Sequence, residues 1–237
     1  MSVIAVIGGT GPQGTGLAYR FARGGHEVVL GSRSQERAVV AATELGERVG
    51  SATVRGAAND HAAKGADLVL LAVPYDGHDA LVAELAPQLA GKVVISCVNP
   101  IGFDKRGPFG LDLGPTSAAE DAQRLLPDST VVGAFHHLSA VSLNGDADLL
   151  DHEDVLVCGD DPDAKAAVIE LAATVTGRPG IDAGALRMAR QLEPLTAVLI
   201  SINKRYKVRS GISVVGLDHA VDVPAAPPVR PAVPAAT

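Results

Sequence analysis

The chain has 237 residues, of which 47% are hydrophobic and 20% are charged, a balance that excludes an intrinsically disordered protein. Its net charge of −7 offers no broad basic surface for a nucleic-acid backbone, so nucleic acid is not expected as a partner. Only 3% of the residues are aromatic, which leaves Ala, Val, Leu and Ile to build a core of the kind that suits a parallel sheet.

Short β-branched runs alternate with helical segments through the first half of the chain. The runs that predict strands cover residues 3–7, 27–30, 52–54, 67–73, 92–98 and 130–135. Between them, segments such as 14–23 and 34–49 place Ala and Leu at helical spacing with charges on the opposite face. This repetition predicts an α/β fold of the doubly wound Rossmann type, with a mainly parallel sheet.

The pattern becomes less regular after Phe135. A further strand is predicted over 155–158, and helices are predicted over 163–174 and 185–205. The last helix has an apolar stripe, so we expect it to cap the C-terminal edge of the sheet and to pair with a second subunit.

The chain therefore divides into three parts. A Rossmann domain over residues 1–150 is followed by a smaller C-terminal α/β portion over 151–217, which is partly helical. Residues 218–237 are rich in Pro and Ala, and the prolines exclude a continuous helix, so a flexible tail is predicted.

The cysteines and the N-terminus bear on the compartment. Cys97 and Cys158 lie in apolar runs, which favours buried thiols in a reducing compartment over a disulfide. The N-terminal MSVIAVIGG lacks a basic region, and no uncharged apolar segment approaches the roughly 20 residues that span a bilayer. We expect a cytoplasmic protein without membrane association. No Cys or His stands at metal-ligand spacing from either cysteine, so no metal site is expected.

A glycine-rich motif follows the first predicted strand. The motif is Gly9-Thr10-Gly11-Pro12-Gln13-Gly14, and a helix is predicted directly after it. In this setting G-x-G-x-x-G is typical of a dinucleotide site. Gly9 would permit a tight turn, Gly11 would let a pyrophosphate approach the backbone, and Gly14 would let the helix pack closely on the strand. The helix N-terminus would add a partial positive charge.

The second strand indicates which dinucleotide is preferred. It ends in Ser32-Arg33, at the place where NAD enzymes have an acidic residue for the ribose 2′-hydroxyl. A hydroxyl and a guanidinium suit a 2′-phosphate instead, because Arg matches phosphate oxygens with a planar, charged fork. The sequence therefore favours NADP(H), although a solvated loop Arg would have the same pattern.

The ends of the later strands should form the rest of the site. Ligands of doubly wound sheets lie outside the carboxyl ends of the strands, which here carry Val73-Pro74, Asn99-Pro100 and the segment 134–140. Contact with a redox partner and a packing role both remain open for His136, whereas a structural role is favoured for His137. No Ser-His-Asp or Tyr-x-x-x-Lys arrangement is evident. Hydride passage between two cofactor rings would need alignment and exclusion of water more than a placed acid.

The sequence resembles the NADPH-dependent reductases of the deazaflavin coenzyme F420, the F420H2:NADP oxidoreductases. Matching segments cover nearly all of residues 2–217 and include GGTGPQGTGLAYRFA, VVISCVNPIGFD, VVGAFHHLSA and DAGALRMARQLEPLTAVLISINKRYK. The resemblance implies direct hydride transfer between NADP(H) and F420, the Rossmann domain binding NADP and the C-terminal portion capping the deazaflavin site. It also implies a homodimer.

The resemblance assigns binding roles to individual residues. The NADP set is Gly9, Thr10, Gly11, Pro12, Gln13, Gly14, Ser32, Arg33, Val73, Pro74 and Ala134. Within this set, Thr10, Ser32 and Arg33 would bind the 2′-phosphate. The F420 pocket would be formed by Asn99, Pro100, His136 and Leu138. No catalytic residue is implied, His136 being the one candidate, and Ser139 stands where some relatives have Pro.

A basic stretch agrees with this assignment. Coenzyme F420 has a phosphodiester and a glutamate tail, and an otherwise acidic chain offers Lys204, Arg205, Lys207 and Arg209. A solvated basic helix end is the alternative interpretation.

Two other functions stay open. A reductase of a small imine or carbonyl on the same scaffold would require an acid in the pocket, for which His136 is the only ready candidate. A non-catalytic NADP-sensing protein would bind the nucleotide without any redox change.

Overall fold

The computed structural model describes residues 1–51 and 53–217. Its main sheet has eight strands in the order β10-β9-β8-β5-β4-β1-β2-β3. All neighbouring pairs are parallel except β8 and β9. The strands are β1 (Val3–Ile7), β2 (Glu27–Ser32), β3 (Val54–Ala58), β4 (Leu68–Leu71), β5 (Val93–Ser96), β8 (Thr130–Gly133), β9 (Leu156–Gly159) and β10 (Ile181–Gly184). The predicted doubly wound, mainly parallel α/β fold is confirmed.

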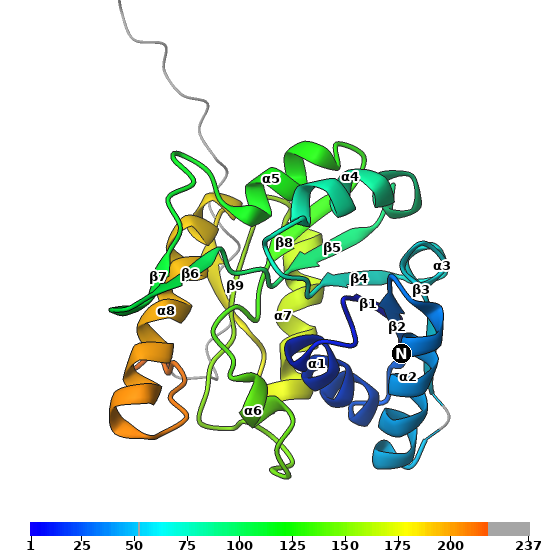
Figure 1. Ribbon diagram of the computed structural model, residues 1–237, viewed down its shortest axis with the longest axis horizontal. Coiled ribbons are helices and arrows are strands. Elements are labelled where there is room, and N and C mark those ends of the chain that lie inside the picture. Colours follow the sequence, from blue (N-terminus) through cyan, green and yellow to red (C-terminus); the bar gives the residue numbers. More distant parts are fainter. Residues whose placement is uncertain (52, 218–237) are drawn as a thin grey trace, which may run out of the picture.

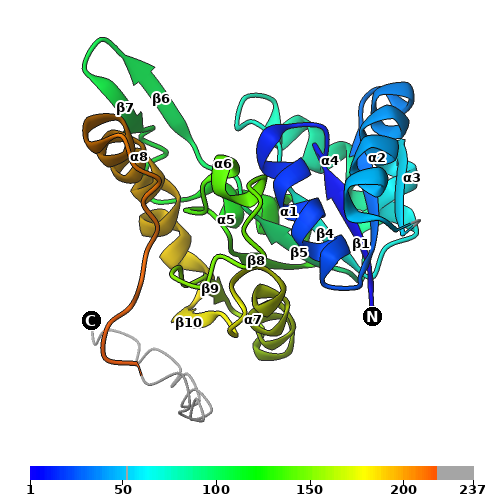
Figure 2. The same cartoon turned by 90° about the horizontal axis from the view of Figure 1, so that it is seen from below.

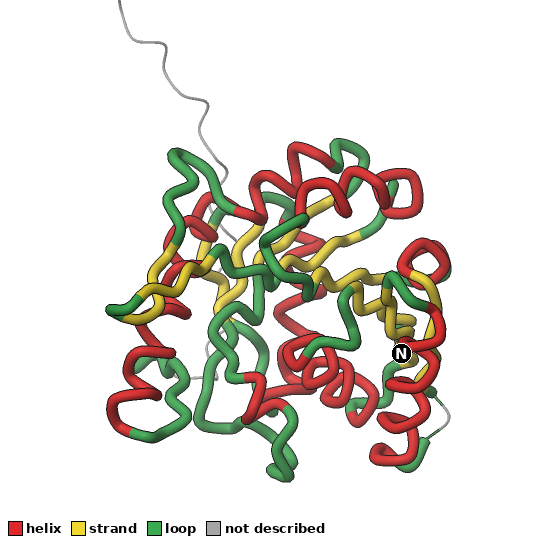
Figure 3. The backbone as a smooth tube through the Cα atoms, viewed as in Figure 1, coloured by secondary structure: helices red, strands yellow, loops and turns green. Residues whose placement is uncertain are grey.

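Helices cover both faces of this sheet (Figures 1 and 3). They are α1 (Pro12–Arg23), α2 (Gln35–Val49), α3 (Asn59–Lys64), α4 (His78–Leu89), α5 (Ala118–Leu125), α6 (Ala140–Leu143), α7 (Pro162–Thr176), a 3-10 turn η1 (Leu186–Met188) and α8 (Ala189–Tyr206). None of those in the described part of the chain is both long and apolar enough to cross a bilayer.

Two apolar cores result, one on each face. One packs side chains of α1, α2 and α7, such as Phe21, Leu45 and Val168, against the strands. The other packs α4, α5 and α8, with Leu85, Ala122 and Leu192, against the opposite face. Because each strand is covered on both sides, near-continuous apolar strands are stable here.

The sequence did not reveal a second, two-stranded sheet. The antiparallel hairpin of β6 (Ile101–Asp104) and β7 (Gly107–Gly110) follows the tip of β5. It extends away from the main sheet and lies along α8 (Figure 2). A Cβ on Gly110 would lie 2.6 Å from Pro194 Cβ, so this glycine lets the hairpin approach α8 closely.

The C-terminal portion is joined to the same sheet. Strand β9 pairs with β8, and β10 pairs with β9, so residues after 151 extend the Rossmann sheet before the chain enters α8. Strand β10 was not predicted, since Ile181–Gly184 contains an Asp and a Gly. The predicted tail over 218–237 lies outside the described residues.

The third strand lies later in the chain than predicted. Residues 52–54 were expected, whereas β3 covers Val54–Ala58 and pairs with Val28–Ser32 of β2. Its sequence VRGAA has low strand propensity, so pairing and packing decide its position. Gly56 lies directly beneath α2, where a Cβ would overlap the backbone of Ala38 and Val39.

We predict that Gly56→Ala destabilises the protein by about 1–3 kcal/mol, because helix backbone cannot move away as a side chain can. The melting temperature should fall by roughly 2–4 °C per kcal/mol in a chain of this size. Gly65→Ala is the matched control, since nothing lies within 4 Å of its Cβ position. Equal melting temperatures for the two variants would contradict this packing.

Candidate active site

A cleft of about 470 Å³ lies between the glycine loop and the carboxyl ends of β4, β5 and β8. One face of α8 forms its far wall. The lining residues are Gly11, Pro12, Gln13, Ala72, Val73, Pro74, Cys97, Asn99, His136, His137, Leu138, Ser139, Ala140, Thr196, Leu199, Ile200 and Asn203. No Asp, Glu, Lys, Arg or Tyr is among them, so within the described residues the cleft wall carries no permanently charged side chain.

The individual glycines of the loop have roles that differ slightly from those predicted. The left-handed residue of the turn is Gly8, with φ of +77°, rather than Gly9. Gly9 is required for space, since its Cβ would meet Val6 O at 2.8 Å, and Gly14 is required because a Cβ would meet Gly8 O at 2.7 Å. Gly11 is different: its nearest neighbour is Gly8 O at 3.4 Å, and its Cβ position is otherwise open. Gly11 therefore leaves room for a ligand rather than for packing.

The tip of β2 lies beside this loop. Gly9 N donates to Gly31 O at 3.0 Å, which ties the loop to the residue before Ser32. The Ser32 hydroxyl is buried and accepts from Ser34 N at 3.2 Å, whereas the Arg33 side chain is exposed. Arg33 is in no ion pair with any described residue. This free cation beside a dinucleotide loop is the geometry expected of a 2′-phosphate site.

Arg37 is a cation that sequence reasoning missed. It is exposed in the first turn of α2, where Arg37 N donates to the capping Ser34 hydroxyl at 3.4 Å. The position of Ser34 as an N-cap before a helical pattern could have indicated it, because that cap places Arg37 one turn after Arg33.

The tips of β5 and β8 are joined at one carbonyl oxygen. Asn99 Nδ2 donates to His136 O at 2.7 Å, and Thr196 Oγ1 of α8 donates to the same oxygen at 2.8 Å. Asn99 Oδ1 is buried and has no partner in the described structure, so it is an acceptor available to a ligand. Two strand tips and the far wall are thus fixed to one another.

The two histidines at the tip of β8 are buried and uncharged. The His136 side chain lies beside Gly133 and Cys158, and burial, with a smaller contribution from His137, lowers its pKa from 6.5 to about 3. Neither of its ring nitrogens has a hydrogen-bond partner among the described residues. His137 Nε2 donates to the Asp154 carbonyl at 2.6 Å, and burial lowers the pKa of His137 too. A neutral imidazole lacks the extra proton that a general acid supplies.

The backbone at this tip is strained. Phe135 has a φ of +63°, which is unusual for a residue with a bulky side chain. Its buried ring packs edge-on against Phe21 with centroids 5.8 Å apart, and its carbonyl accepts from Gln13 Nε2 at 3.3 Å. The glycine loop and the core therefore hold this conformation in place, as is common at functional sites.

Seven of the residues that the resemblance assigned do not line the cleft. Five of them lie in the glycine loop or at the tip of β2, namely Gly9, Thr10, Gly14, Ser32 and Arg33, and the other two are Pro100 and Ala134. Pro100 lines a second cavity instead of the cleft, and Ala134 is wholly buried, with its N–H donating to Ser96 O at 3.0 Å. The other predicted deazaflavin contacts, Asn99, His136 and Leu138, all line the cleft. Ser139, which stands where the resemblance gives some relatives a Pro, accepts a hydrogen bond from Ser142 N and caps α6.

Known proteins resemble this chain over most of its length. The sequence profile of a family described as "NADP oxidoreductase coenzyme F420-dependent" matches residues 3–100. The F420-dependent NADP reductase of Methanothermobacter thermautotrophicus is 41% identical over 221 residues, covering 90% of this chain and 95% of that protein. The corresponding protein of Methanocaldococcus jannaschii is 38% identical, covering 91% and 99%.

The chain belongs to the F420-dependent NADP reductase family. A solved structure agrees: a protein from Arthrobacter, provisionally named an F420-dependent NADP reductase, superposes with a TM-score of 0.75 at 29% identity. The match covers 90% of this chain and all of the other. The resemblance drawn from the sequence is therefore confirmed at the level of the family and the fold.

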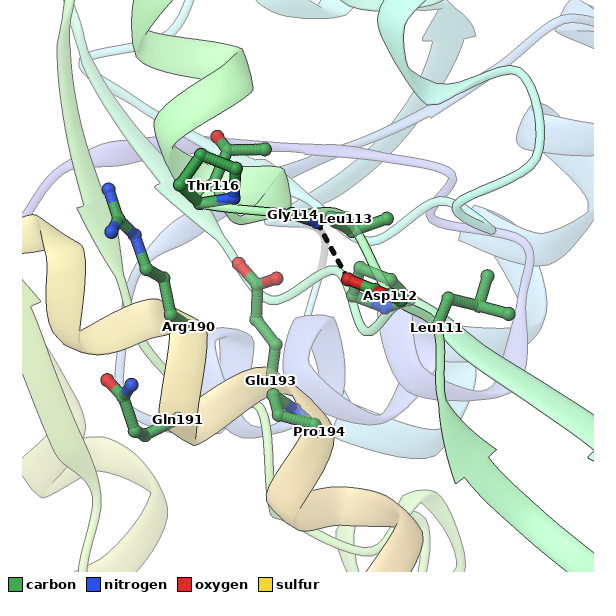
Figure 4. A pocket seen from close by; sticks show the side chains of 11 residues that line it. Leu111, Asp112, Leu113, Gly114, Thr116, Arg190, Gln191, Glu193 and Pro194 are labelled. Atoms are coloured by element: carbon green, nitrogen blue, oxygen red, sulfur yellow. Dashed lines mark hydrogen bonds between the residues drawn. The ribbon is translucent and has the colours of Figure 1, made fainter.

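The second cavity of this reductase-family chain, about 330 Å³, has a buried carboxylate at its centre (Figure 4). Glu193 Oε2 and Oε1 accept from Ala118 N and Ala119 N at 2.9 and 3.0 Å, at the N-terminus of α5. Burial nevertheless raises the Glu193 pKa to about 7. Glu193 fastens α8 to α5 one turn before Thr196 reaches the cleft, so we assign this cavity a structural role.

Gly11→Val should abolish measurable NADP(H) binding while leaving the melting temperature nearly unchanged, because its Cβ position opens toward the cleft. Gly14→Ala should instead lower the melting temperature, since its Cβ would overlap the loop backbone. Isothermal titration calorimetry and thermal unfolding distinguish the two. Undiminished affinity in Gly11→Val would show that the nucleotide lies elsewhere.

Stability should fall as the pH drops from about 6.5 toward 3, because the unfolded chain binds a proton on His136 that the folded chain excludes. A His136→Leu variant should lose part of this slope in denaturant titrations. The rate of hydride transfer should show no inflection near the ordinary imidazole pKa of 6.5. Such an inflection, abolished by His136→Leu, would restore His136 as a general acid.

Proposed function

We propose that this protein transfers a hydride directly between NADP(H) and coenzyme F420. The observation that carries the proposal is the cleft itself, which has a dinucleotide loop at one end and an uncharged wall at the other. Membership of the F420-dependent NADP reductase family supports it. An imine or carbonyl reductase would need a protonated acid, and the histidines of the cleft are neutral.

The residues present fit the two groups. When bound, the nicotinamide and the deazaflavin would supply the hydride donor and acceptor. The start of α1 would bind the pyrophosphate through backbone amides, and Ser32 and Arg33 would bind the 2′-phosphate. Asn99 Oδ1, buried without a partner, would accept a hydrogen bond from the second ring. Leu138 and Ile200 would exclude water from the gap, which keeps the hydride from being lost to solvent.

The anionic tail of F420 would leave the cleft along the end of α8. Thr196, Leu199, Ile200 and Asn203 line the cleft at helical spacing, so the same face continues toward Tyr206 and Lys207. Lys204, Arg205, Lys207 and Arg209 are exposed there and form no ion pair with a described residue. They would attract phosphodiester and glutamate groups at low salt.

The hairpin and α8 would form the interface of a homodimer. Phe103 is 70% exposed, Phe109 44% and Val198 52%, and all three lie on this projecting pair of elements. Exposed aromatic side chains are enriched in the cores of protein interfaces, and here they lie on both faces of the projecting hairpin. Cytoplasmic function would suit Cys97 and Cys158, which are free and buried.

Arg33→Ala should raise the KM for NADPH roughly 10-fold or more, because a charge-assisted contact to the extra phosphate is lost. The KM for NADH should change little. Steady-state kinetics with both nucleotides measure this, with Arg55→Ala as control, since Arg55 pairs with Glu27 outside the cleft. Equal effects on NADPH and NADH would remove the 2′-phosphate assignment.

The activity is tested by mixing purified protein with NADPH and oxidised F420 without oxygen. The visible absorbance of the deazaflavin should bleach as NADPH is consumed, in equal amounts. Tight NADP(H) binding without bleaching would support a nucleotide-sensing protein instead.

A further inference from the structure

One face of α1 holds a segment that lies 120 residues later in the chain. The segment 142–148 begins in the last residues of α6 and continues beyond its end. Ser139, the N-cap of α6, and Ala140, its first residue, line the cleft. The segment contacts α1 at Pro12, Gly16 and Arg20, which are spaced four residues apart and so lie in a row along the helix. None of these three contacts is needed by the dinucleotide motif itself.

Arg20 is the strongest of the three contacts. Its side chain is fully buried and has no buried carboxylate partner; instead, all five guanidinium N–H groups donate to backbone carbonyls. The acceptors, at 2.5–3.3 Å, are the carbonyls of Ser142, Leu143, Gly145, Ala147 and Asp148. A buried charge is costly unless it is fully hydrogen-bonded, so the segment cannot leave this position without exposing or orphaning the guanidinium.

Asn144 connects this segment to the cleft by two hydrogen bonds. Its Nδ2 donates to Pro12 O at 2.9 Å and to Ala140 O at 2.7 Å. One amide group therefore joins the glycine loop, at the nucleotide end, to the wall that starts at Ser139. Gly16 makes this approach possible, because a Cβ there would lie 2.6 Å from Leu143 Cβ and 2.8 Å from Asn144 Nδ2.

Two further side chains hold the outside of the segment. Arg48 of α2 donates to Asn144 O at 2.7 Å and lies over the Tyr19 ring, 3.8 Å from its centroid. Arg23 pairs with Asp148 at 2.7 Å. Arg20 therefore holds the segment from its buried side, and Arg23 of α1 and Arg48 of α2 hold it from its exposed side.

We propose that Asn144, on the segment that Arg20 holds in place, is a positioning residue that fixes the spacing between the nucleotide loop and the part of the cleft wall formed by Ser139 and Ala140. The inference rests on the proposed function, in which two cofactor rings must meet in the cleft at a fixed distance. Neither Asn144 nor Arg20 touches the reacting atoms. A displacement of one wall by about 1 Å can cost two orders of magnitude in rate.

The test uses Asn144→Ala, which removes both Nδ2 bonds, with Val141→Ala as the matched control. Val141 lies in the same turn, but its side chain is 60% exposed. In Asn144→Ala with NADP⁺ bound, amides of residues 140–148 should exchange with deuterium faster than in the wild type. Calorimetric affinity for NADP⁺ should stay within a few-fold, and kcat for F420 reduction should fall roughly 10-fold or more.

A kinetic isotope effect separates positioning from simple loss of folded protein. With NADPH deuterated at C4, the ratio of light to heavy transfer rates should depend more steeply on temperature in Asn144→Ala, because the gap is less firmly held. Partial unfolding lowers the amount of active enzyme and leaves this ratio unchanged. Arg20→Lys, which keeps three donors, should lie between the wild type and Asn144→Ala.

An unchanged exchange rate, or an isotope effect with the temperature dependence of the wild type, would overturn the proposal. If the wild type does not reduce F420 at all, the proposed function fails. The exchange measurement on the NADP⁺-bound protein then still decides whether Asn144 fastens the wall.

Discussion

The cleft depends on two hydrogen bonds that converge on the His136 carbonyl. Asn99 donates from the tip of β5, and Thr196 donates from α8, which lies across the carboxyl edge of the sheet. A Rossmann sheet alone provides only one side of a redox site. Because α8 is fastened to β8 at this oxygen, and to α5 through Glu193, the second side stands opposite the first.

The wall of the cleft is buried, and its titratable side chains stay uncharged. Burial keeps His136 and His137 neutral and raises the pKa of the Cys97 thiol to about 12, so the cleft offers no ready acid and no thiolate. The cations lie outside it, Arg33 beside the glycine loop and the basic group at the end of α8. This separation suits a reaction in which charge is recognised at the periphery and a hydride crosses in the dry centre.

Much of this could be predicted from the sequence, because the glycine loop and the Ser32-Arg33 pair are local patterns with a fixed place in the fold. The doubly wound, mainly parallel sheet followed from the repeated strand and helix runs. The β6–β7 hairpin could not be predicted, since Ile101–Asp104 and Gly107–Gly110 form strands through pairing and contact with α8. The roles of Arg20, Asn144 and Glu193 were hidden for another reason: their distant partners lie 74 to 132 residues away. Pro100, which the resemblance assigns to the deazaflavin pocket, lines the second cavity in this structure, because the chain turns there into the hairpin.

The most direct test of the account follows the hydride itself. NADPH carrying deuterium at both C4 positions is oxidised by F420 in ordinary water, and the reduced deazaflavin is examined by mass spectrometry. Direct transfer across a water-excluding cleft predicts one deuterium retained in each reduced F420. Reduced F420 that contains only hydrogen from solvent would contradict the account, because the two rings would then not meet.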